Sequence, residues 1–195
     1  MIAYCQSTLR WLFESVGVSQ VCIGGDSAGG NLAIHLLSRL PPHPPGSITS
    51  SLIISPALDL SLTFPDRATL YTLSQEYDYV TLVMGDAWIN TAIHGTCDSN
   101  PSSEILKKKP HYSPFYQYPP ERLPNPLIVY GQRETLGPSI QDWISRLKRV
   151  QEVAVICEAW MPHDYVLLGS GLTGMLGSKS QEGIERIAKH LYDSL

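Results

Sequence analysis

The stretch VCIGGDSAGGNLAIHLL, residues 21–37, decides the fold of this chain. It begins with a short apolar run, Val21–Gly24, of the kind that forms a fully buried parallel strand. A glycine-rich segment follows at once, and after it apolar residues recur at helical spacing until the chain reaches Pro41 and Pro42. The pattern therefore predicts a strand, a tight turn and a helix in direct succession.

The turn Gly25-Asp26-Ser27-Ala28-Gly29 has the form G-x-S-x-G, which is typical of a nucleophile elbow. A serine on such a sharp turn has strained backbone geometry, and small flanking residues let strand and helix approach. We expect the Ser27 hydroxyl to act as a nucleophile and the Ala28 amide, at a helix N-terminus, to stabilise an oxyanion. Asp26 is expected to hydrogen-bond neighbouring backbone and fix the turn.

A second interpretation of this segment is a glycine-rich turn that binds phosphate or only packs. The sequence contains neither a G-x-G-x-x-G fingerprint nor a P-loop lysine here, so the elbow is favoured.

Three further apolar runs, residues 51–56, 127–131 and 153–157, predict strands. Helical spacing recurs in an opening helix over 2–16, in 139–149 and in a closing helix around Ile184–Leu191. This alternation predicts an α/β fold, a mostly parallel sheet with helices on both faces. Four strands make a small sheet whose first strand would expose an apolar edge. We infer that N-terminal strands are missing and are supplied by a partner chain or by the rest of a longer protein.

We expect residues 1–195 to form a single domain with a long excursion, residues 61–112, over the site. The excursion has helical character around 80–93. Its aromatic residues are candidates for the lining of a pocket, although ordinary packing explains most of them: Phe64, Tyr71, Tyr77, Tyr79 and Trp88.

A serine nucleophile needs a base, which is normally a histidine held by a carboxylate. Of the six histidines, His163 follows the fourth predicted strand by a few residues, and so lies at the same sheet edge as Ser27. Glu134 follows the third strand. The chain order Ser27, Glu134, His163 is the order in which hydrolases with this fold place the nucleophile, the acid and the base. Two rival acids are Asp164, although sequence neighbours rarely point at each other in the geometry that the role needs, and Asp142, which lies far into its helix.

Composition narrows the function classes. Hydrophobic residues make up 43% and charged residues 16% of the chain, and the net charge is −4, which indicates a globular protein without a nucleic-acid-binding face. The run Lys107-Lys108-Lys109 is interpreted as solvated surface. No apolar stretch reaches the roughly 20 residues of a membrane helix, and no signal peptide is visible.

The cysteines Cys5, Cys22, Cys97 and Cys157 form no C-x-x-C pair, so neither a zinc site nor a redox motif is predicted. Cys22 and Cys157 lie inside apolar runs, where a free cysteine behaves as a small hydrophobe. We expect all four thiols to be reduced and the protein to be cytoplasmic. Neither a metal nor another cofactor is expected.

The sequence resembles the hormone-sensitive-lipase-like, or GDXG, branch of the α/β-hydrolases. Its segment GDSAGGNLA is residues 25–33, and Ser55-Pro56-Ala57-Leu58-Asp59-Leu60 is similar to that family's SP-x-x-DL. Asp78, Trp88, the late Tyr112-Ser113-Pro114 and the acid turn at Glu134 also fit. The resemblance implies an α/β-hydrolase fold and a serine esterase that acts on small-molecule esters through an acyl-enzyme, with Ser27, Glu134 and His163 as triad.

The HGGG loop, which supplies oxyanion-hole amides in that family, has no match here, so only the Ala28 amide can be assigned. The resemblance begins at about the middle of a full-length relative, so the chain is interpreted as a C-terminal portion. Two alternatives stay open: a hydrolase-like module that binds without turnover, and a truncated product that folds poorly alone. A homo-oligomer is a further alternative to a missing N-terminal half.

Overall fold

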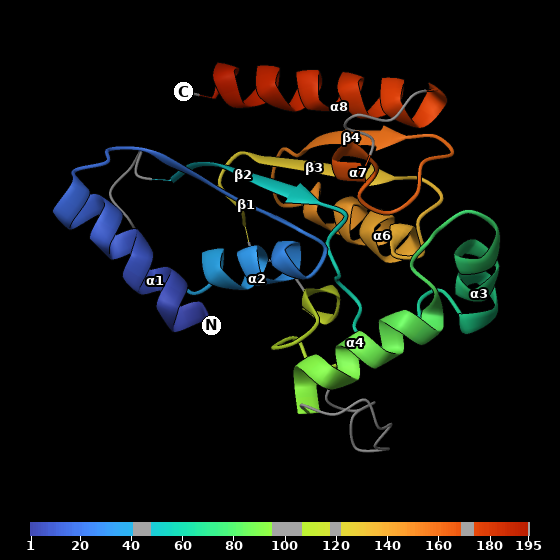
Figure 1. Cartoon of the computed structure of the whole chain (residues 1–195). Helices are drawn as coiled ribbons and strands as arrows, with labels where there is room; N and C mark the ends of the chain where they lie inside the picture. Colours follow the sequence, from blue (N-terminus) through green and yellow to red (C-terminus); the bar gives the residue numbers. More distant parts are fainter. Residues whose placement is uncertain (41–47, 95–106, 118–121, 169–173, 195) are drawn as a thin grey trace.

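A four-stranded parallel sheet forms the centre of the computed structural model, which describes residues 1–40, 48–94, 107–117, 122–168 and 174–194. The strands lie in the order β1-β2-β3-β4 (Figure 1). Their bounds are β1, Val21–Asp26; β2, Ile48–Ile54; β3, Pro126–Gly131; and β4, Ala154–Glu158. The predicted parallel sheet is confirmed, and its strands all end at one edge.

Helices cover both faces of the sheet, as predicted. Helices α1, α2 and α6 lie on one face and α8 lies on the other (Figure 1). The bounds are α1, Ile2–Trp11, continued by a π-helical turn η1, Leu12–Val16; α2, Ser27–Leu37; α6, Gly137–Leu147; the short α7, Tyr165–Leu168; and α8, Gly174–Asp193. The opening helix ends at Gly17, whose φ of 78° is the left-handed conformation that glycine adopts without steric cost.

Alternate residues of β3 belong to two separate apolar cores. Ile128 and Tyr130 pack into the core shared with α2 and α6, whereas Leu127 and Val129 pack into the core under α7 and α8. Every residue of β3 is buried, as expected for a strand covered on both faces. β3 is therefore the most protected strand of the sheet.

The edge strands β1 and β4 are less well covered, which corrects one expectation. Ile23 packs against the helices, but Cys22 and Cys157 are exposed rather than buried as small hydrophobes. Their strands have a neighbour on one side only within the described sheet. The thiols of Cys5, Cys22 and Cys157 are free, as predicted, and Cys97 lies outside the described residues.

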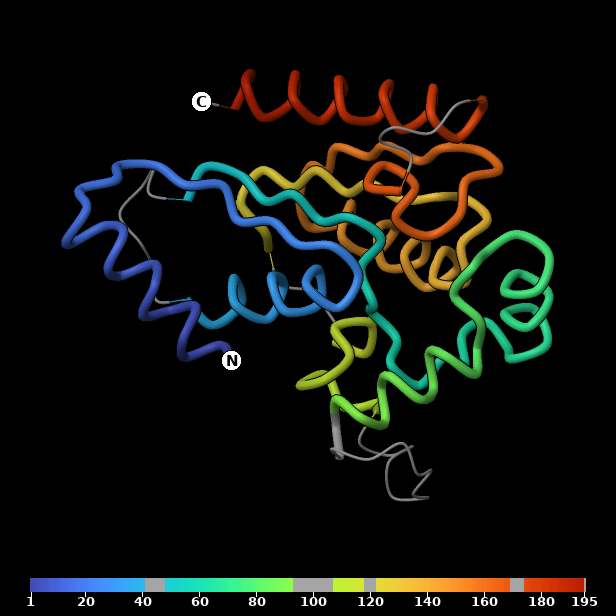
Figure 2. Tube along the Cα trace, viewed as in Figure 1, coloured from blue at the N-terminus to red at the C-terminus, as the bar shows by residue number. Residues whose placement is uncertain are grey.

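The excursion contains the helices α3 (Arg67–Glu76) and α4 (Leu82–His94), and the 3-10 turn η2 (Pro114–Tyr116) follows it. Figure 2 shows α3 beyond the carboxyl ends of the strands. The helix predicted near 80–93 is confirmed as α4. Helix α3 was not predicted. Its start signal is Asp66, whose side chain accepts a hydrogen bond from the Thr69 amide at 2.8 Å.

The basic run of the excursion is not wholly solvated. Lys108 and Lys109 are exposed, but Lys107 is buried and its carbonyl accepts a hydrogen bond from the Ser113 hydroxyl. The prediction of a solvated lysine run is therefore wrong at Lys107.

Ile128→Ala tests the central strand. Ile128 is fully buried, so its truncation leaves a cavity and should lower the free energy of unfolding by about 2–5 kcal/mol. Val83→Ala is the control, because Val83 is 80% exposed and its truncation should change this free energy by less than about 0.5 kcal/mol. Chemical denaturation measures both. Equal losses in the two variants would contradict the assignment of β3 to the core.

Candidate active site

Ser27 stands on the sharp turn between β1 and α2. Its φ of 49° is left-handed, which is strained for a serine. A Cβ at Gly25 would lie 2.3 Å from the Gly29 carbonyl oxygen, and one at Gly30 would lie 3.0 Å from Pro56 Cβ. A Cβ at Gly29 would meet only Asp26, at 3.9 Å. The close approach of strand and helix therefore depends on Gly25 and Gly30, and Gly29 is not sterically required.

Asp26 and Ala28 flank the serine. Asp26 is the N-cap residue of α2, but its exposed side chain makes no capping hydrogen bond. The expectation that Asp26 fixes the turn by bonding neighbouring backbone is therefore wrong. The Ala28 amide lies in the first turn of α2, where backbone N–H groups have no partner within the helix. It is available to an anion beside Ser27.

His163 brings its ring to the serine from the loop after β4. Its Nε2 lies 2.9 Å from Ser27 Oγ, within hydrogen-bond distance. The His163 side chain is almost completely buried. The structure thus joins the hydroxyl and the imidazole that the sequence analysis selected.

Glu134 approaches the other ring nitrogen from the loop after β3. Its Oε2 lies 3.7 Å from His163 Nδ1, a distance for an ion pair but too long for a hydrogen bond. Accordingly, His163 Nδ1 has no hydrogen-bond partner among the described residues. The same Oε2 accepts hydrogen bonds from Ser55 Oγ at 2.6 Å and from the Gly131 amide at 3.3 Å. Glu134 is fully buried, and these donors hold it in place.

The two rival acids behave differently. Asp164 does face its neighbour: its Oδ2 lies 3.1 Å from His163 Nε2, the nitrogen that also faces Ser27. Asp164 does not face Nδ1, the nitrogen that an orienting acid would hold, as expected for a sequence neighbour, and the φ of 51° at Asp164 instead turns its side chain toward Nε2. Asp142 instead pairs with Arg146 on α6 at 2.9 Å.

Charge around the imidazole is strongly negative. Burial alone would lower the pKa of His163, but the Asp164 and Glu134 carboxylates outweigh it and raise that pKa to about 10. Burial raises the pKa of Glu134, and His163 opposes that shift. Tyr79, whose ring centre lies 6.0 Å from that of His163, has its pKa raised to about 12 by burial and by nearby carboxylates. The arrangement favours a charged imidazolium.

Ser55 is a site residue whose role the sequence analysis missed. It directly follows β2, is fully buried, and has a φ of 40°. Its hydroxyl donates to Glu134 and accepts from the Asp164 amide at 3.1 Å, so it links the two acids. Its position immediately after a strand, at the edge where Ser27 lies, was the available signal.

A cavity of about 250 Å³ opens beside Ser27 and His163. Its walls are mostly apolar. They come from the elbow, the segment after β2, α4 and the acid loop: Ala28, Asn31, Ala57, Leu60, Leu62, Val80, Thr81, Gly85, Trp88, Ile89, Ala92, Thr135 and Leu136. Of the predicted aromatic lining residues only Trp88 contributes. Phe64 instead packs on Phe115, with ring centres 4.8 Å apart.

Asp59 shapes one wall of this cavity. It is buried, and its carboxylate accepts hydrogen bonds from the amides of Ser61, Thr63 and Phe64 at 2.9–3.1 Å. These bonds fix the turn that contains Leu60 and Leu62, which both line the cavity. The polar network thus positions apolar side chains.

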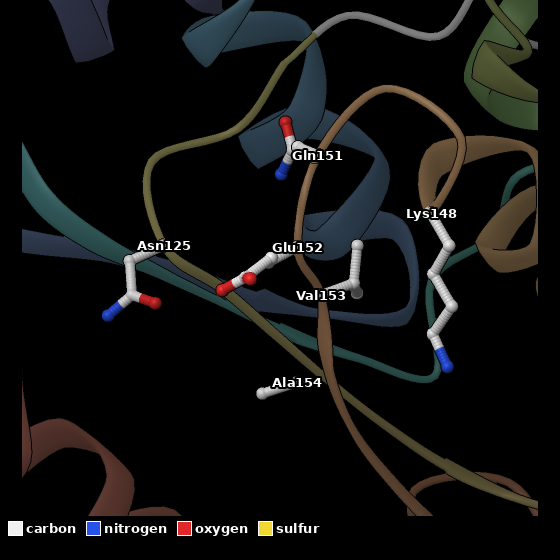
Figure 3. Close-up of a pocket in the computed structure, with 6 residues that line it drawn as sticks. All are labelled: Asn125, Lys148, Gln151, Glu152, Val153 and Ala154. Carbon is white, nitrogen blue, oxygen red and sulfur yellow. The ribbon is translucent and has the colours of Figure 1, made fainter.

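A larger hollow of about 800 Å³ lies at the opposite end of the strands, where α6 connects to β4 (Figure 3). Its six lining residues are Asn125, Lys148, Gln151, Glu152, Val153 and Ala154. The side-chain amide of Gln151 is already hydrogen-bonded to the Leu123 backbone. Its Oε1 accepts from the Leu123 amide at 2.8 Å, and its Nε2 donates to the Leu123 carbonyl oxygen at 3.1 Å. This hollow is separate from the site around Ser27.

The described residues contain no cluster of three or more side chains able to hold a metal ion. Within the same ranges, no helix is long and apolar enough to span a membrane.

Gly131→Ala tests how closely the loops that carry Glu134 and His163 approach each other. A Cβ there would lie 2.2 Å from the Met161 carbonyl oxygen, so the loop that carries His163 must shift, and we expect the free energy of unfolding to fall by about 1–3 kcal/mol. Gly29→Ala is the control, because space exists for its methyl group and stability should not fall. Denaturant melts compare the two. Unchanged stability of Gly131→Ala would contradict this packing.

Comparison with known proteins identifies the family of the chain. A family model described as alpha/beta hydrolase fold matches residues 2–167. No curated protein matches the chain. Similar solved structures include a hormone-sensitive lipase from a metagenome library, at 22% identity and a TM-score of 0.77, with 100% of this chain and 61% of that chain covered.

Two further structures are similar. Carboxyl esterase 2 from the fungus Tuber melanosporum is 20% identical, with a TM-score of 0.74, and 100% of this chain and 62% of that chain are covered. An esterase from the bacterial hormone-sensitive lipase family is 23% identical, with a TM-score of 0.76 and coverages of 99% and 60%. This chain therefore spans about three fifths of the length of these structures. Because the family model covers most of the sequence, the chain belongs to the α/β-hydrolase family.

Proposed function

We propose that this chain carries the catalytic centre of a serine carboxylic ester hydrolase that works through an acyl-enzyme. The observation that carries the proposal is the 2.9 Å contact between Ser27 Oγ and His163 Nε2 at the rim of an apolar cavity. A hydroxyl beside an imidazole, next to a pocket for an apolar group, is suited to acyl transfer.

In the first step Ser27 Oγ attacks the ester carbonyl carbon while His163 Nε2 accepts the hydroxyl proton. The tetrahedral intermediate collapses as the same nitrogen returns the proton to the departing alcohol oxygen. Water then attacks the acyl-enzyme by the reverse sequence and releases the acid and free Ser27.

Glu134 supports the imidazolium that forms in each step. Its carboxylate lies 3.7 Å from His163 Nδ1 in the resting chain, and hydrogen bonds at catalytic sites often tighten only when substrate binds. Held by Ser55 and the Gly131 amide, Glu134 stabilises positive charge on the ring throughout the reaction.

The Ala28 amide supplies one donor to the oxyanion. Removing a single oxyanion-hole donor commonly costs about 10²–10³ in rate. The sequence contains no HGGG segment, so the Ala28 amide is the one donor assigned here. We therefore expect this chain by itself to hydrolyse esters more slowly than a site with two such donors.

The cavity limits the size of the substrate group that it can hold. Its volume of about 250 Å³ is below the roughly 300–1000 Å³ typical of pockets for drug-sized ligands. Apolar walls favour a short hydrocarbon group over a charged one. We propose esters with one short apolar substituent as substrates.

A non-catalytic binding module is the alternative, and the single assigned oxyanion donor favours it. Such a module would bind ligand equally well after Ser27→Ala and would show no turnover. Isothermal titration with a short-chain ester analogue, beside a hydrolysis assay, distinguishes the two functions.

Fluorophosphonate labelling tests the nucleophile. We expect covalent modification of Ser27 in the folded chain, located by peptide mapping, because the probe captures an activated serine. Ser27→Ala should abolish labelling and lower hydrolysis of a p-nitrophenyl ester by at least about 1000-fold. Ser145→Ala, on the exposed face of α6, is the control. Labelling at another serine, with Ser27 unmodified, would contradict the proposal.

Asp164→Asn tests the electrostatics. A general base must be neutral, so activity should rise with pH through the pKa of His163, which Asp164 and Glu134 raise to about 10. Removing one carboxylate at 3.1 Å should move this acid limb of kcat/KM to lower pH by about one to three units. Asp142→Asn, whose carboxylate pairs with Arg146, should leave the limb unchanged. A limb unmoved in Asp164→Asn would rule out this role.

A further inference from the structure

Asp78 lies in the excursion, between α3 and α4, yet its carboxylate contacts both loops that carry the proposed acid and base. Its Oδ2 accepts a hydrogen bond from the Thr135 amide at 2.7 Å. Its Oδ1 accepts one from the His163 amide at 3.1 Å and a longer one from the Val80 amide at 3.4 Å. One side chain thus spans two segments separated by a strand and a helix.

The Thr135 and His163 amides that bind Asp78 belong to the backbone that carries Glu134 and His163. Thr135 is the residue after Glu134, and the second amide belongs to His163 itself. Asp78 therefore holds the backbone on each side of the gap between Glu134 and His163. Asp78 does not itself line the cavity, and the hydrogen bonds of its carboxylate go to backbone amides, so it acts through the backbone.

Further contacts join the same segments. The Thr135 hydroxyl donates to the Val80 carbonyl oxygen at 2.9 Å, which links the acid loop to the excursion. The Arg133 guanidinium lies over two aromatic rings, 4.7 Å from the Tyr77 ring centre and 4.4 Å from that of Trp160. Cation–π contacts of this kind are attractive. Asp78 and Arg133 therefore each connect the excursion with the loop after β3, which carries Glu134, and the loop after β4, which carries His163.

We propose that Asp78 is a positioning residue that sets the separation between Glu134 and His163, within a three-loop clasp formed by Asp78, Thr135, His163, Tyr77, Arg133 and Trp160. The inference rests on the proposed function for its catalytic meaning. The clasp itself is a property of the folded chain and can be tested without activity.

The chemistry of the contact requires a carboxylate. An ionised aspartate only accepts hydrogen bonds, so both oxygens can receive an amide. An asparagine in its place has one accepting oxygen and one donating NH₂ group. Whichever way that amide lies, its NH₂ group faces the N–H of either Thr135 or His163. Asp78→Asn should therefore open the clasp although its size is unchanged.

Asp86→Asn is the matched control. Asp86 lies on α4 in the same excursion and pairs with Arg67 at 2.7 Å, away from both triad loops. It undergoes the same loss of charge and the same isosteric replacement. A difference between the two variants therefore reports on the contacts of Asp78 and not on net charge.

The first readout is hydrogen exchange of the backbone amides by NMR in the full chain. In Asp78→Asn the amides of Thr135 and His163 should exchange about tenfold faster or more, and in Asp86→Asn they should exchange as in the unsubstituted chain. The second readout is the NMR titration of the His163 ring. Loosening the contact with Glu134 should lower the pKa of His163 in Asp78→Asn only. The groups that face this ring are Ser27, Tyr79, Glu134 and Asp164, and Asp78 binds the backbone amide of the same residue.

Unchanged exchange at either amide, or an unchanged His163 titration, in folded Asp78→Asn would overturn the inference. If that variant does not fold, the unsubstituted chain provides the test. The Thr135 and His163 amides should then exchange at least about tenfold more slowly than the amide of exposed Trp160, and equal rates would overturn it. Absence of fluorophosphonate labelling at Ser27 in the unsubstituted chain would instead count against the proposed function alone, because neither NMR readout depends on it.

Discussion

The parallel register of the four strands is the constraint on which the site depends. Asp26 pairs with Ile54, Ile54 with Val129, and Gly131 with Glu158, so the strands finish close to one line. Each strand then delivers one polar residue to the same edge: Ser27, Ser55, Glu134 and His163. No single segment could bring these groups together, since the spacing of the four strand ends is set by the backbone hydrogen bonds of the sheet.

Negative charge is concentrated around a single imidazole. Glu134 faces one ring nitrogen and Asp164 the other, and Asp78 binds the backbone of the same residue. Such surroundings stabilise the imidazolium, which is the form that would develop in the proposed acyl transfer. They also weaken the ring as a base in the resting state. The site thus favours stabilisation of the charged intermediate over readiness to accept the first proton.

Local patterns predicted the fold well, because strands and helices leave periodic apolar signatures and parallel topology follows from their alternation. Ser27, Glu134 and His163 could be selected because each follows a predicted strand. The roles of Asp78 and Gly131 could not be predicted, since they depend on which loops touch, whereas the place of Ser55 directly after a strand was a signal left unused. The approach of Asp164 to Nε2 was not predicted, because it depends on a left-handed backbone angle at that residue, which no sequence pattern revealed.

The exposed thiols of Cys22 and Cys157 lie on β1 and β4, the two outermost strands of the described sheet. Both side chains are accessible to solvent, which is a condition for attaching a spectroscopic label to a cysteine. With the remaining cysteines replaced, a spin label at each margin would measure the width of the sheet directly. The relative motion of β1 and β4 in solution could then be followed from the distribution of the distance between the two labels.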